Sequence, residues 1–583
     1  MEDFGLNFVY RRGKKSQSKA AHTVFPRMRP TSCTCTNCLK CIKDWLPLEF
    51  KREMIQLVKL AGPVIISQLM VFLINFVSIV FCGHLGETEL AGVALAISVI
   101  IVTGISVGMG LSSAFDTLIS QTYGSGNLKR VGVILQRGVL ILLLACFPCW
   151  AILLNTENML LAVKQNPEVA RHSQMYVNIF IPALPAAFMY QLQGRYLQNQ
   201  GIIWPQVITG AIGNVLNAIV NYILLYVLDL GVVGSAAANS ISQTASALIL
   251  FIYIYWKGLH KATWSGWSKD CLQEWGLFTK VAIPSMLMLC LEWWTFEIGG
   301  LLAGLISEVE LGAQSIVYQM VTIVFMVPMG FMVAASVRVG NALGAGNIEQ
   351  AKTSGKVAVI LAFAISVIFG LVLGLCKNVI GYIFTTEKEI IQRVSKVMII
   401  YGVFHSVDAV AAVTGGVIRG AGKPMVGALC NLVGYYFIGI PIGVSLMFAA
   451  KMGIMGLWLG LSLCVTIQAT FYIFYLFKLD WKKVAEEAMM RAGVPVQDME
   501  NKGHAHSPVT ESQVNIISSN SLSNEEFNSD LLTPGQDGTA GAAGPRPLSF
   551  WQLVVRRGLT VVLMVLILVV GIIASKMLPK LLK

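Results

Sequence analysis

The sequence predicts an all-α polytopic membrane protein. It would consist of two parallel six-helix lobes, related by a pseudo-two-fold axis along the membrane normal, and a thirteenth C-terminal transmembrane helix. Three observations predict this fold class. Hydrophobic residues make up 55% of the 583 residues, and the mean hydropathy is +0.68. Thirteen segments are long and apolar enough to cross a bilayer, and the motifs of the first twelve repeat about 220 residues apart.

The composition excludes most other classes of protein. Charged residues are only 13% of the chain, against about 25% in an average soluble domain. A soluble enzyme, a coiled coil and a disordered chain are therefore excluded, and the lipid bilayer is the expected surrounding medium. The net charge of +12 does not indicate a nucleic-acid partner, because the basic residues are scattered and lie at segment ends.

Each predicted span has roughly the 20 mostly apolar residues that a helix needs to cross the hydrocarbon core. The spans are 57–82, 90–114, 131–154, 175–194, 203–228, 232–256, 281–306, 311–335, 357–376, 395–418, 425–449, 452–477 and 559–575. The predicted parts are a cytosolic N-terminal segment (1–56), a first lobe (57–256), an interlobe cytosolic connection (257–280), a second lobe (281–477), a cytosolic linker (478–549) and a C-terminal helix with a short external tail (550–583). The linker is rich in Ser, Asn, Gly and Glu, which is typical of disordered chains.

Lysine and arginine are unevenly distributed over the loops. The even-numbered connections hold twelve of these residues and the odd-numbered ones seven. This bias places the even loops and the basic residues 1–56 in the cytosol, and thirteen spans then place the C-terminus outside. No signal peptide is expected, because the first long apolar run begins near Leu57 without a cleavage-like site.

Four of the twelve cysteines cluster near the N-terminus, at Cys33, Cys35, Cys38 and Cys41. Their spacing fits a zinc site, and their position close to the first span fits reversible acylation. The sequence leaves the role of this cluster open. The cysteines inside the apolar spans are expected to be small packing residues.

The repeat extends through all six spans of each lobe. Lys59-Leu-Ala-Gly-Pro63 corresponds to Lys280-Val-Ala-Ile-Pro284, and the two glycines Gly110 and Gly124 correspond to Gly330 and Gly344. An even number of spans returns the chain to the same side, so the two lobes must be parallel. Transport proteins built in this way bind substrate between the lobes near the midplane and rock the lobes for alternating access.

Few ionisable residues lie inside the spans. Such residues indicate function, because a charge at the bilayer centre costs roughly 2.5–3.5 kcal/mol on insertion scales. Glu292 and Asp408 are expected near the midplane, Glu297 lies five residues beyond Glu292, and His405 shares a helix face with Asp408. These four residues of the second lobe are the candidate proton- or cation-binding site. Asp116, at a span end, is expected to anchor a helix terminus or loop.

Two carboxylates at one depth on two helices can share a proton or hold a cation. The alternative is that a nearby hydroxyl or histidine neutralises each of them in a structural role. Aromatic faces beside a carboxylate also favour a desolvated organic cation, although any one ring could instead face lipid or pack. The residues expected to line a substrate cavity are Trp293, Phe296, Tyr318, Gln68, Asn75 and Gln319.

Several segments resemble the multidrug and toxin extrusion (MATE) family. They are Gln-Leu-Met-Val-Phe-Leu at 68–73, Phe-Cys-Gly-His-Leu-Gly at 81–86, Asp-Thr-Leu-Ile-Ser-Gln-Thr-Tyr-Gly-Ser at 116–125, Glu-Trp-Trp at 292–294, Ala-Ala-Ser-Val-Arg-Val-Gly-Asn-Ala-Leu-Gly-Ala-Gly at 334–346 and Gly-Gly-Val-Ile-Arg-Gly-Ala-Gly at 415–422. The resemblance covers about residues 50–480, and the thirteenth span looks like that of the vertebrate branch. It implies a plasma-membrane antiporter, in the apical membrane of epithelial cells, that exports cationic drugs, toxins and metabolites in exchange for protons. It also places Glu292, Glu297 and Asp408 in the second-lobe acidic cluster of the family.

Two departures from the family pattern affect these expectations. Some relatives carry Glu where this chain has Gln319, and some prokaryotic members use an Asp in the first span, which has no carboxylate here. A channel, a sodium-coupled exporter and a transporter of lipids or other substrates remain alternatives. An enzyme is not expected, because the chain has no metal pair, nucleophile–base pair or phosphate-binding loop. No cofactor is expected, and the expected partners are small organic cations, protons and the bilayer.

Overall fold

The computed structural model describes residues 48–83, 86–494 and 549–581, and all the secondary structure in these ranges is helical. The described residues from Arg52 onward form one compact unit, which contains all the described helices except the first residues of α2 (Leu48–Cys82). The cysteine cluster at Cys33, Cys35, Cys38 and Cys41 lies outside the described residues.

Thirteen helical segments of the described chain are long and apolar enough to cross a membrane, which confirms the number predicted from the sequence. After α2, the helices of the first lobe are α3 (Glu87–Ile100), α4 (Ser106–Ser112), α5 (Phe115–Gly124), α6 (Leu128–Leu153), α7 (Thr156–Ala162), α8 (Pro167–Phe180), α9 (Leu184–Asn199), α10 (Trp204–Tyr222) and α11 (Gly231–Trp256). Those of the second lobe are α12 (Trp275–Gly304), α13 (Glu308–Gly344), α14 (Ile348–Ile380), α15 (Lys388–Gly420), α16 (Pro424–Asn431), α17 (Ile440–Val444) and α18 (Ile454–Lys478), followed by α19 (Trp481–Arg491) and α22 (Phe550–Leu581).

Several spans contain π-helical turns that keep the helix continuous while shifting its register. Ile101–Ile105 joins α3 to α4, Ile223–Val227 extends α10, and Leu432–Gly439 and Ser445–Ala449 flank α17. Such turns are frequent near functional sites. One apolar core lies mainly in the first lobe, joined by Phe278, Val281 and Ala282 of α12, and a second lies in the second lobe. Large apolar side chains such as Leu375 and Phe251 remain exposed. That exposure fits a lipid-facing surface.

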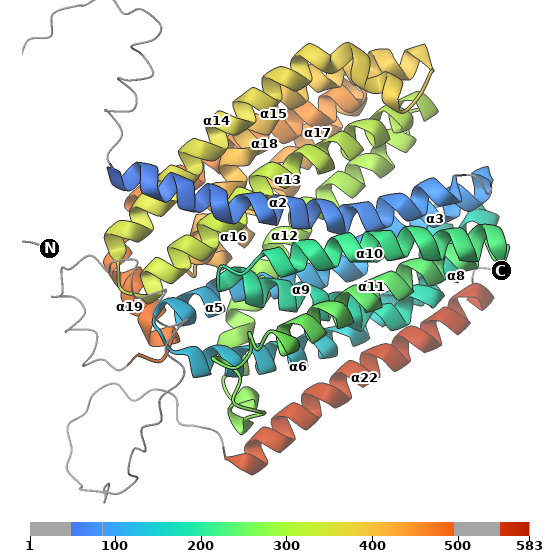
Figure 1. Ribbon diagram of the computed structural model, residues 1–583. Coiled ribbons are helices and arrows are strands. Elements are labelled where there is room, and N and C mark those ends of the chain that lie inside the picture. Colours follow the sequence, from blue (N-terminus) through green and yellow to red (C-terminus); the bar gives the residue numbers. More distant parts are fainter. Residues whose placement is uncertain (1–47, 84–85, 495–548, 582–583) are drawn as a thin grey trace, which may run out of the picture. The chain divides into compact units, whose positions relative to one another are not determined.

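The last helix, α22, packs along α6 of the first lobe (Figure 1). Near its start, Arg557 donates two hydrogen bonds, of 2.9 and 2.7 Å, to the carbonyl oxygen of Leu272 in the interlobe connection. Near its other end, the Asn155 side chain donates to the carbonyl oxygen of Gly571 at 2.9 Å. The helix therefore crosses the bundle once, as an odd thirteenth span must.

The contacts between the lobes repeat with the sequence. A Cβ atom on Gly110 would meet Met286, and one on Gly330 would meet Ile65, the residue 221 positions before Met286. Further along the same membrane spans, Gly124 lies against the backbone of Asn341. Gly344 lies against the backbone of Gln121, the residue 220 positions before Asn341. These paired close approaches are what a pseudo-two-fold axis between parallel lobes produces, and they explain why the glycines recur in both halves.

The hydrogen bonds and ion pairs between the lobes lie mainly toward the face at which α5 and α13 end. Arg338 of α13 pairs with Glu53 of α2 at 2.5 Å, and Gln121 of α5 donates to the carbonyl oxygen of Gly420 at 2.9 Å. The outermost such bond among the described residues runs from the Trp294 indole to the carbonyl oxygen of Val102, at 3.0 Å. The lobes are thus closed at the face that carries the ends of α5 and α13, which is the face predicted to be cytosolic.

Helix α19 bridges the same face, and it corrects the predicted linker, which does not begin at residue 478. Its apolar side chains Val484, Ala485, Ala488 and Met489 are buried. Arg491 donates to the Gln121 side chain of the first lobe at 2.9 Å, and Lys423 of the second lobe donates to Glu487 at 2.6 Å. An amphipathic pattern with an Asp480 N-cap explains why this stretch is helical. Residues 495–548 of the predicted linker are outside the described ranges.

The close packing at this face leads to a testable prediction. Gly344→Val places a side chain against the backbone of Gln121, so the lobes can no longer meet there. We expect amide-hydrogen protection of residues 117–124 to fall by on the order of tenfold. Gly276→Ala is the matched control, since a Cβ atom at Gly276 meets nothing within 4 Å. Equal protection in the two variants would contradict the assignment of this contact as the closed face.

Candidate functional site

The carboxyl groups of Glu292 and Asp408 lie together inside the second lobe. Glu292 is on α12 and is half-buried, whereas Asp408 on α15 is only 5% exposed. The two groups are close enough for the charge of one to influence the other. Among the described residues, none donates a hydrogen bond to either carboxyl group. The structural alternative, in which a hydroxyl or histidine neutralises each carboxylate, therefore has no support in the hydrogen-bond pattern of this pair.

Glu297 is in a different environment from Glu292. It lies further along α12, and the Tyr318 hydroxyl donates a hydrogen bond to its Oε1 atom at 3.2 Å. The Phe296 ring lies beside Tyr318 and Trp458, with ring centroids 6.2 and 6.0 Å apart. The predicted residues Glu297, Phe296 and Tyr318 are therefore brought together, and Trp458 joins them from α18.

His405 is fully buried within the second lobe. Its ring lies against Tyr401, whose hydroxyl is 3.4 Å from Nδ1, and its Nε2 has no hydrogen-bond partner among the described residues. The structure therefore places His405 in the packed aromatic core formed around Trp458. Trp293 and Gln319 are partly buried on α12 and α13, while the neighbouring Trp294 makes the interlobe bond to Val102.

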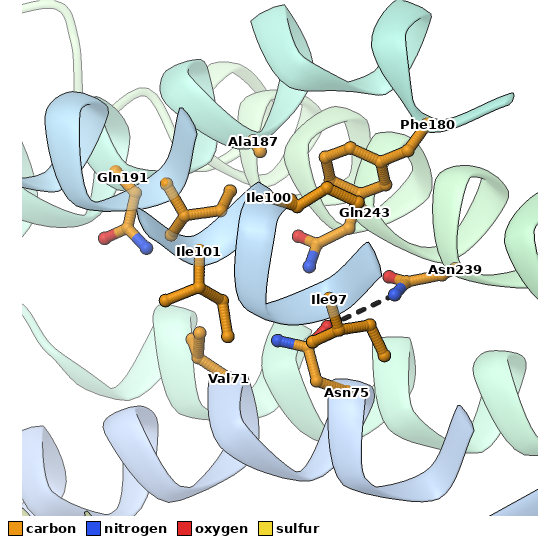
Figure 2. A pocket seen from close by; sticks show the side chains of 11 residues that line it. Val71, Asn75, Ile97, Ile100, Ile101, Phe180, Ala187, Gln191, Asn239 and Gln243 are labelled. Carbon is orange, nitrogen blue, oxygen red and sulfur yellow. Dashed lines mark hydrogen bonds between the residues drawn. The ribbon is translucent and has the colours of Figure 1, made fainter. Parts of the chain in front are cut away.

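Asn75 belongs to a separate cavity in the first lobe (Figure 2). The Asn239 amide donates to the Asn75 side-chain oxygen at 3.2 Å. Gln191 and Gln243 line the same cavity, and within the described chain neither of their amide groups has a hydrogen-bond partner. The walls are otherwise apolar. Gln68 is buried on α2 but does not line this cavity.

Between the lobes, the structure reveals a buried charge cluster that the sequence did not predict. Asp116 of α5 is fully buried and accepts hydrogen bonds of 3.0 and 3.3 Å from Arg195 of the same lobe. Arg419 of α15, which is 2% exposed, approaches Asp116 from the other lobe at 3.6 Å. The expectation that Asp116 anchors a helix terminus or loop is incomplete, because its carboxylate also pairs with an arginine of the other lobe.

Arg195 and Arg419 each lie at the end of an apolar run, so the sequence alone groups them with the loop charges. For Arg419, the motif itself is the indication that was available in the sequence. This residue lies inside Gly-Gly-Val-Ile-Arg-Gly-Ala-Gly, where small residues permit close helix contact. The structure also places two unpredicted tyrosines near the carboxyl pair. Tyr435 is within electrostatic range of both Glu292 and Asp408, and Tyr472 is within range of Glu292.

This arrangement can bind and release positive charge. It offers carboxylates without hydrogen-bond donors, aromatic faces nearby, and a buried arginine between the carboxyl pair and the contact of the two lobes. No group of three or more His, Cys, Asp or Glu residues in the described ranges could hold a metal ion.

Comparison with known proteins gives consistent matches. The MatE family model matches residues 63–223 and 284–445, one stretch in each lobe. The chain is 62% identical over 560 residues to Multidrug and toxin extrusion protein 1 of Danio rerio, with 94% of each chain covered. It is 52% identical over 538 residues to Multidrug and toxin extrusion protein 1 of Homo sapiens, covering 90% of this chain and 93% of that one. The crystal structure of the eukaryotic MATE transporter AtDTX14 is 31% identical, covers 76% of this chain and 100% of its own, and has a TM-score of 0.74.

Proposed function

This chain belongs to the MatE family of multidrug and toxin extrusion transporters, and on that basis we propose that it exports organic cations from the cell in exchange for protons. It is a multi-pass membrane transporter and not an enzyme. The proposed exchange uses one acidic site in the second lobe for both the proton and the organic cation, and moves that site between the two sides by rocking the lobes.

One observation carries the proposal. Glu292 and Asp408 are two neighbouring carboxyl groups in an apolar interior, without a hydrogen-bond donor from the described chain. Two like charges so placed repel each other, and Asp408 is almost completely removed from water, so the pair is stabilised by binding a positive charge. A proton and an organic cation can each supply that charge, which makes them competitors for the same site.

The aromatic side chains beside the carboxyl groups favour an organic cation as the substrate. Aromatic rings attract cations through the negative face of the ring, and this attraction is strongest when water is excluded. Phe296 and Tyr318 provide such faces beside a third carboxyl group, that of Glu297, and Trp458 packs behind Phe296. A large, weakly hydrated cation gains from these surfaces, whereas a small metal ion would need a shell of oxygen ligands.

The proposed cycle follows from the competition between the proton and the organic cation for one acidic site. At the external face, where protons are more abundant, protonation removes the charge that holds the organic cation, and the cation leaves. After reorientation, the site loses its proton to the cytosol and binds a new cation. The lobes are closed at the face that carries α19, and we assign this state to the half of the proposed cycle in which the site faces outward.

The direct test is uptake by proteoliposomes of radiolabelled tetraethylammonium, a permanently charged organic cation, under an imposed pH gradient with and without sodium. The proposal predicts saturable uptake driven by the pH gradient and unchanged by sodium. Uptake that requires a sodium gradient would instead support the sodium-coupled alternative. Flux that does not saturate would support a channel.

The sidedness forms part of the proposal. We place residues 1–56 and the linker in the cytosol and the C-terminus outside, at the plasma membrane and specifically the apical membrane of epithelial cells. Epitope tags give the test: antibody should reach a tag after Lys583 in intact cells, but a tag before Leu48 only after permeabilisation. The reverse pattern would overturn the orientation.

A further inference from the structure

Two arginines share one carboxylate at the junction of the lobes. Asp116 pairs with Arg195 at 3.0 Å and lies 3.6 Å from Arg419, and all three side chains are almost completely buried. The cluster therefore carries an uncompensated positive charge. Arg419 Nε and Nη1 and Arg195 Nη2 are buried without a hydrogen-bond partner in the described chain. An uncompensated buried charge is strongly destabilising unless another anion lies close by.

Glu292 is positioned to provide that anion. Arg419 Nη2 lies 3.9 Å from the sulfur of Met288 on α12. Glu292 is four residues further along α12, so it occupies the same helix face about one turn away. The Arg419 guanidinium and the Glu292 carboxyl group lie within range of a direct Coulombic interaction. Arg419 therefore stands between the carboxyl pair and the Asp116 contact that closes the lobes.

Other ionisable groups surround this pair. Those within electrostatic range of Arg419 or Glu292 on the neighbouring helices are Asp116, Arg195, Asp408, Tyr435, Cys464 and Tyr472. Asp116 and Asp408 are the other carboxyl groups in this set, and Asp116 is held in ion pairs with both arginines. Asp408 lies on α15 with Arg419, eleven residues earlier, which is about 16 Å along the helix. Beyond the ion-pair cluster of Asp116 and Arg195, Glu292 is therefore the carboxyl group whose change of charge acts on Arg419.

We propose that Arg419 is a positioning residue that couples the occupancy of Glu292 to closure of the lobes. This proposal rests on the proposed function and extends it. When Glu292 is ionised and empty, its negative charge compensates Arg419 and stabilises the Asp116–Arg419 contact. When Glu292 holds a proton or an organic cation, that compensation is lost, the buried positive charge destabilises the contact, and the closed face opens.

Such coupling controls one of the two transitions of the proposed cycle. Because the empty, ionised site keeps the lobes closed at the face that carries α19, a protein in this state opens that face only after Glu292 is loaded. The proton and the organic cation have the same effect on Arg419, since each neutralises the same carboxylate.

The test measures amide-hydrogen protection of residues 117–124 in substrate-free protein in nanodiscs, corrected for intrinsic exchange rates, between pH 8 and pH 5.5. Wild type should lose protection by on the order of tenfold as Glu292 is protonated, in the range of ordinary coupling between sites. Arg419→Gln should show low protection with no dependence on pH, and Arg419→Lys, which keeps the charge, should restore part of the dependence. Glu292→Gln tests the other partner of the Arg419–Glu292 interaction. This variant should show low protection at both pH values.

Arg338→Gln is the matched control. It removes another ion pair between the lobes, Arg338–Glu53, at a site on α13 and α2 that is separate from the Asp116 cluster. A purely structural role for Arg419 predicts that the two arginine variants behave alike. The coupling proposal predicts instead that Arg338→Gln lowers protection by the same factor at both pH values, so that its pH dependence stays that of wild type.

The outcomes separate this inference from the proposed function. Wild-type protein that shows proton-driven tetraethylammonium uptake but pH-independent protection would overturn the coupling alone. A Glu292→Gln variant that keeps the wild-type pH dependence would also overturn the coupling. If Arg419→Gln does not fold, Glu292→Gln provides the decisive test of the coupling. Wild-type protein without proton-driven uptake would overturn the proposed function.

Discussion

Glu292→Gln and Asp408→Asn are each expected to lower proton-driven uptake of tetraethylammonium by at least about a hundredfold, which corresponds to roughly 2.7 kcal/mol. Each substitution keeps the shape of the side chain but removes one of the two negative charges that the proton and the cation share. The remaining carboxyl group lacks the like charge whose repulsion favours uptake of a positive ion. Initial rates in proteoliposomes with a matched amount of reconstituted protein provide the measurement.

Glu349→Gln is the control for these variants. Glu349 is an exposed residue of α14 that pairs with Lys352 at 2.9 Å, outside the candidate site. It should transport at the wild-type rate. Near-normal uptake with wild-type pH dependence in both Glu292→Gln and Asp408→Asn would remove the acidic pair from the mechanism.

Asp116→Asn is expected to produce the largest loss of stability, about 3–5 kcal/mol, since removal of one partner from a buried ion pair leaves the other charge uncompensated. Here two arginines, Arg195 and Arg419, depend on the same carboxylate. The expected result is a large drop in melting temperature of the detergent-purified protein, with reduced yield. Glu349→Gln again provides the comparison, because an exposed pair contributes only about 0–1 kcal/mol. Similar melting temperatures in the two variants would show that the cluster does not hold the lobes together.

Much of the fold could be predicted because it depends on length and hydropathy. Thirteen apolar segments are a direct consequence of the requirement that backbone polar groups be satisfied inside lipid. The repeat also predicted which residues are equivalent: Gly124 and Gly344 are 220 positions apart and make equivalent contacts in the two lobes. Span ends were less accurate, since α2 begins at Leu48 rather than near Leu57.

The acidic pair was predictable, but its surroundings were not. A carboxylate near the middle of an apolar span is conspicuous, and Glu292 and Asp408 were found on that basis. Arg419 was not found, because a basic residue at the end of a span is also what positive-inside topology produces. Only the packing of α15 against α5 distinguishes a buried arginine from a loop charge. His405 was grouped with Asp408 by helix spacing, yet its ring packs against Tyr401 in the lobe core.

The most direct test of the central claim, that one acidic site serves both the proton and the organic cation, is equilibrium binding of tetraethylammonium to the purified protein between pH 8 and pH 5.5. The charge of this probe does not change with pH, so any change in affinity comes from the protein. If one proton must be displaced for each cation bound, the apparent affinity should fall about tenfold per pH unit below the pH at which the site becomes protonated. The decrease should be absent in Glu292→Gln. Affinity that stays constant across the whole range in the wild-type protein would contradict a shared site and would require a separate pathway for the proton.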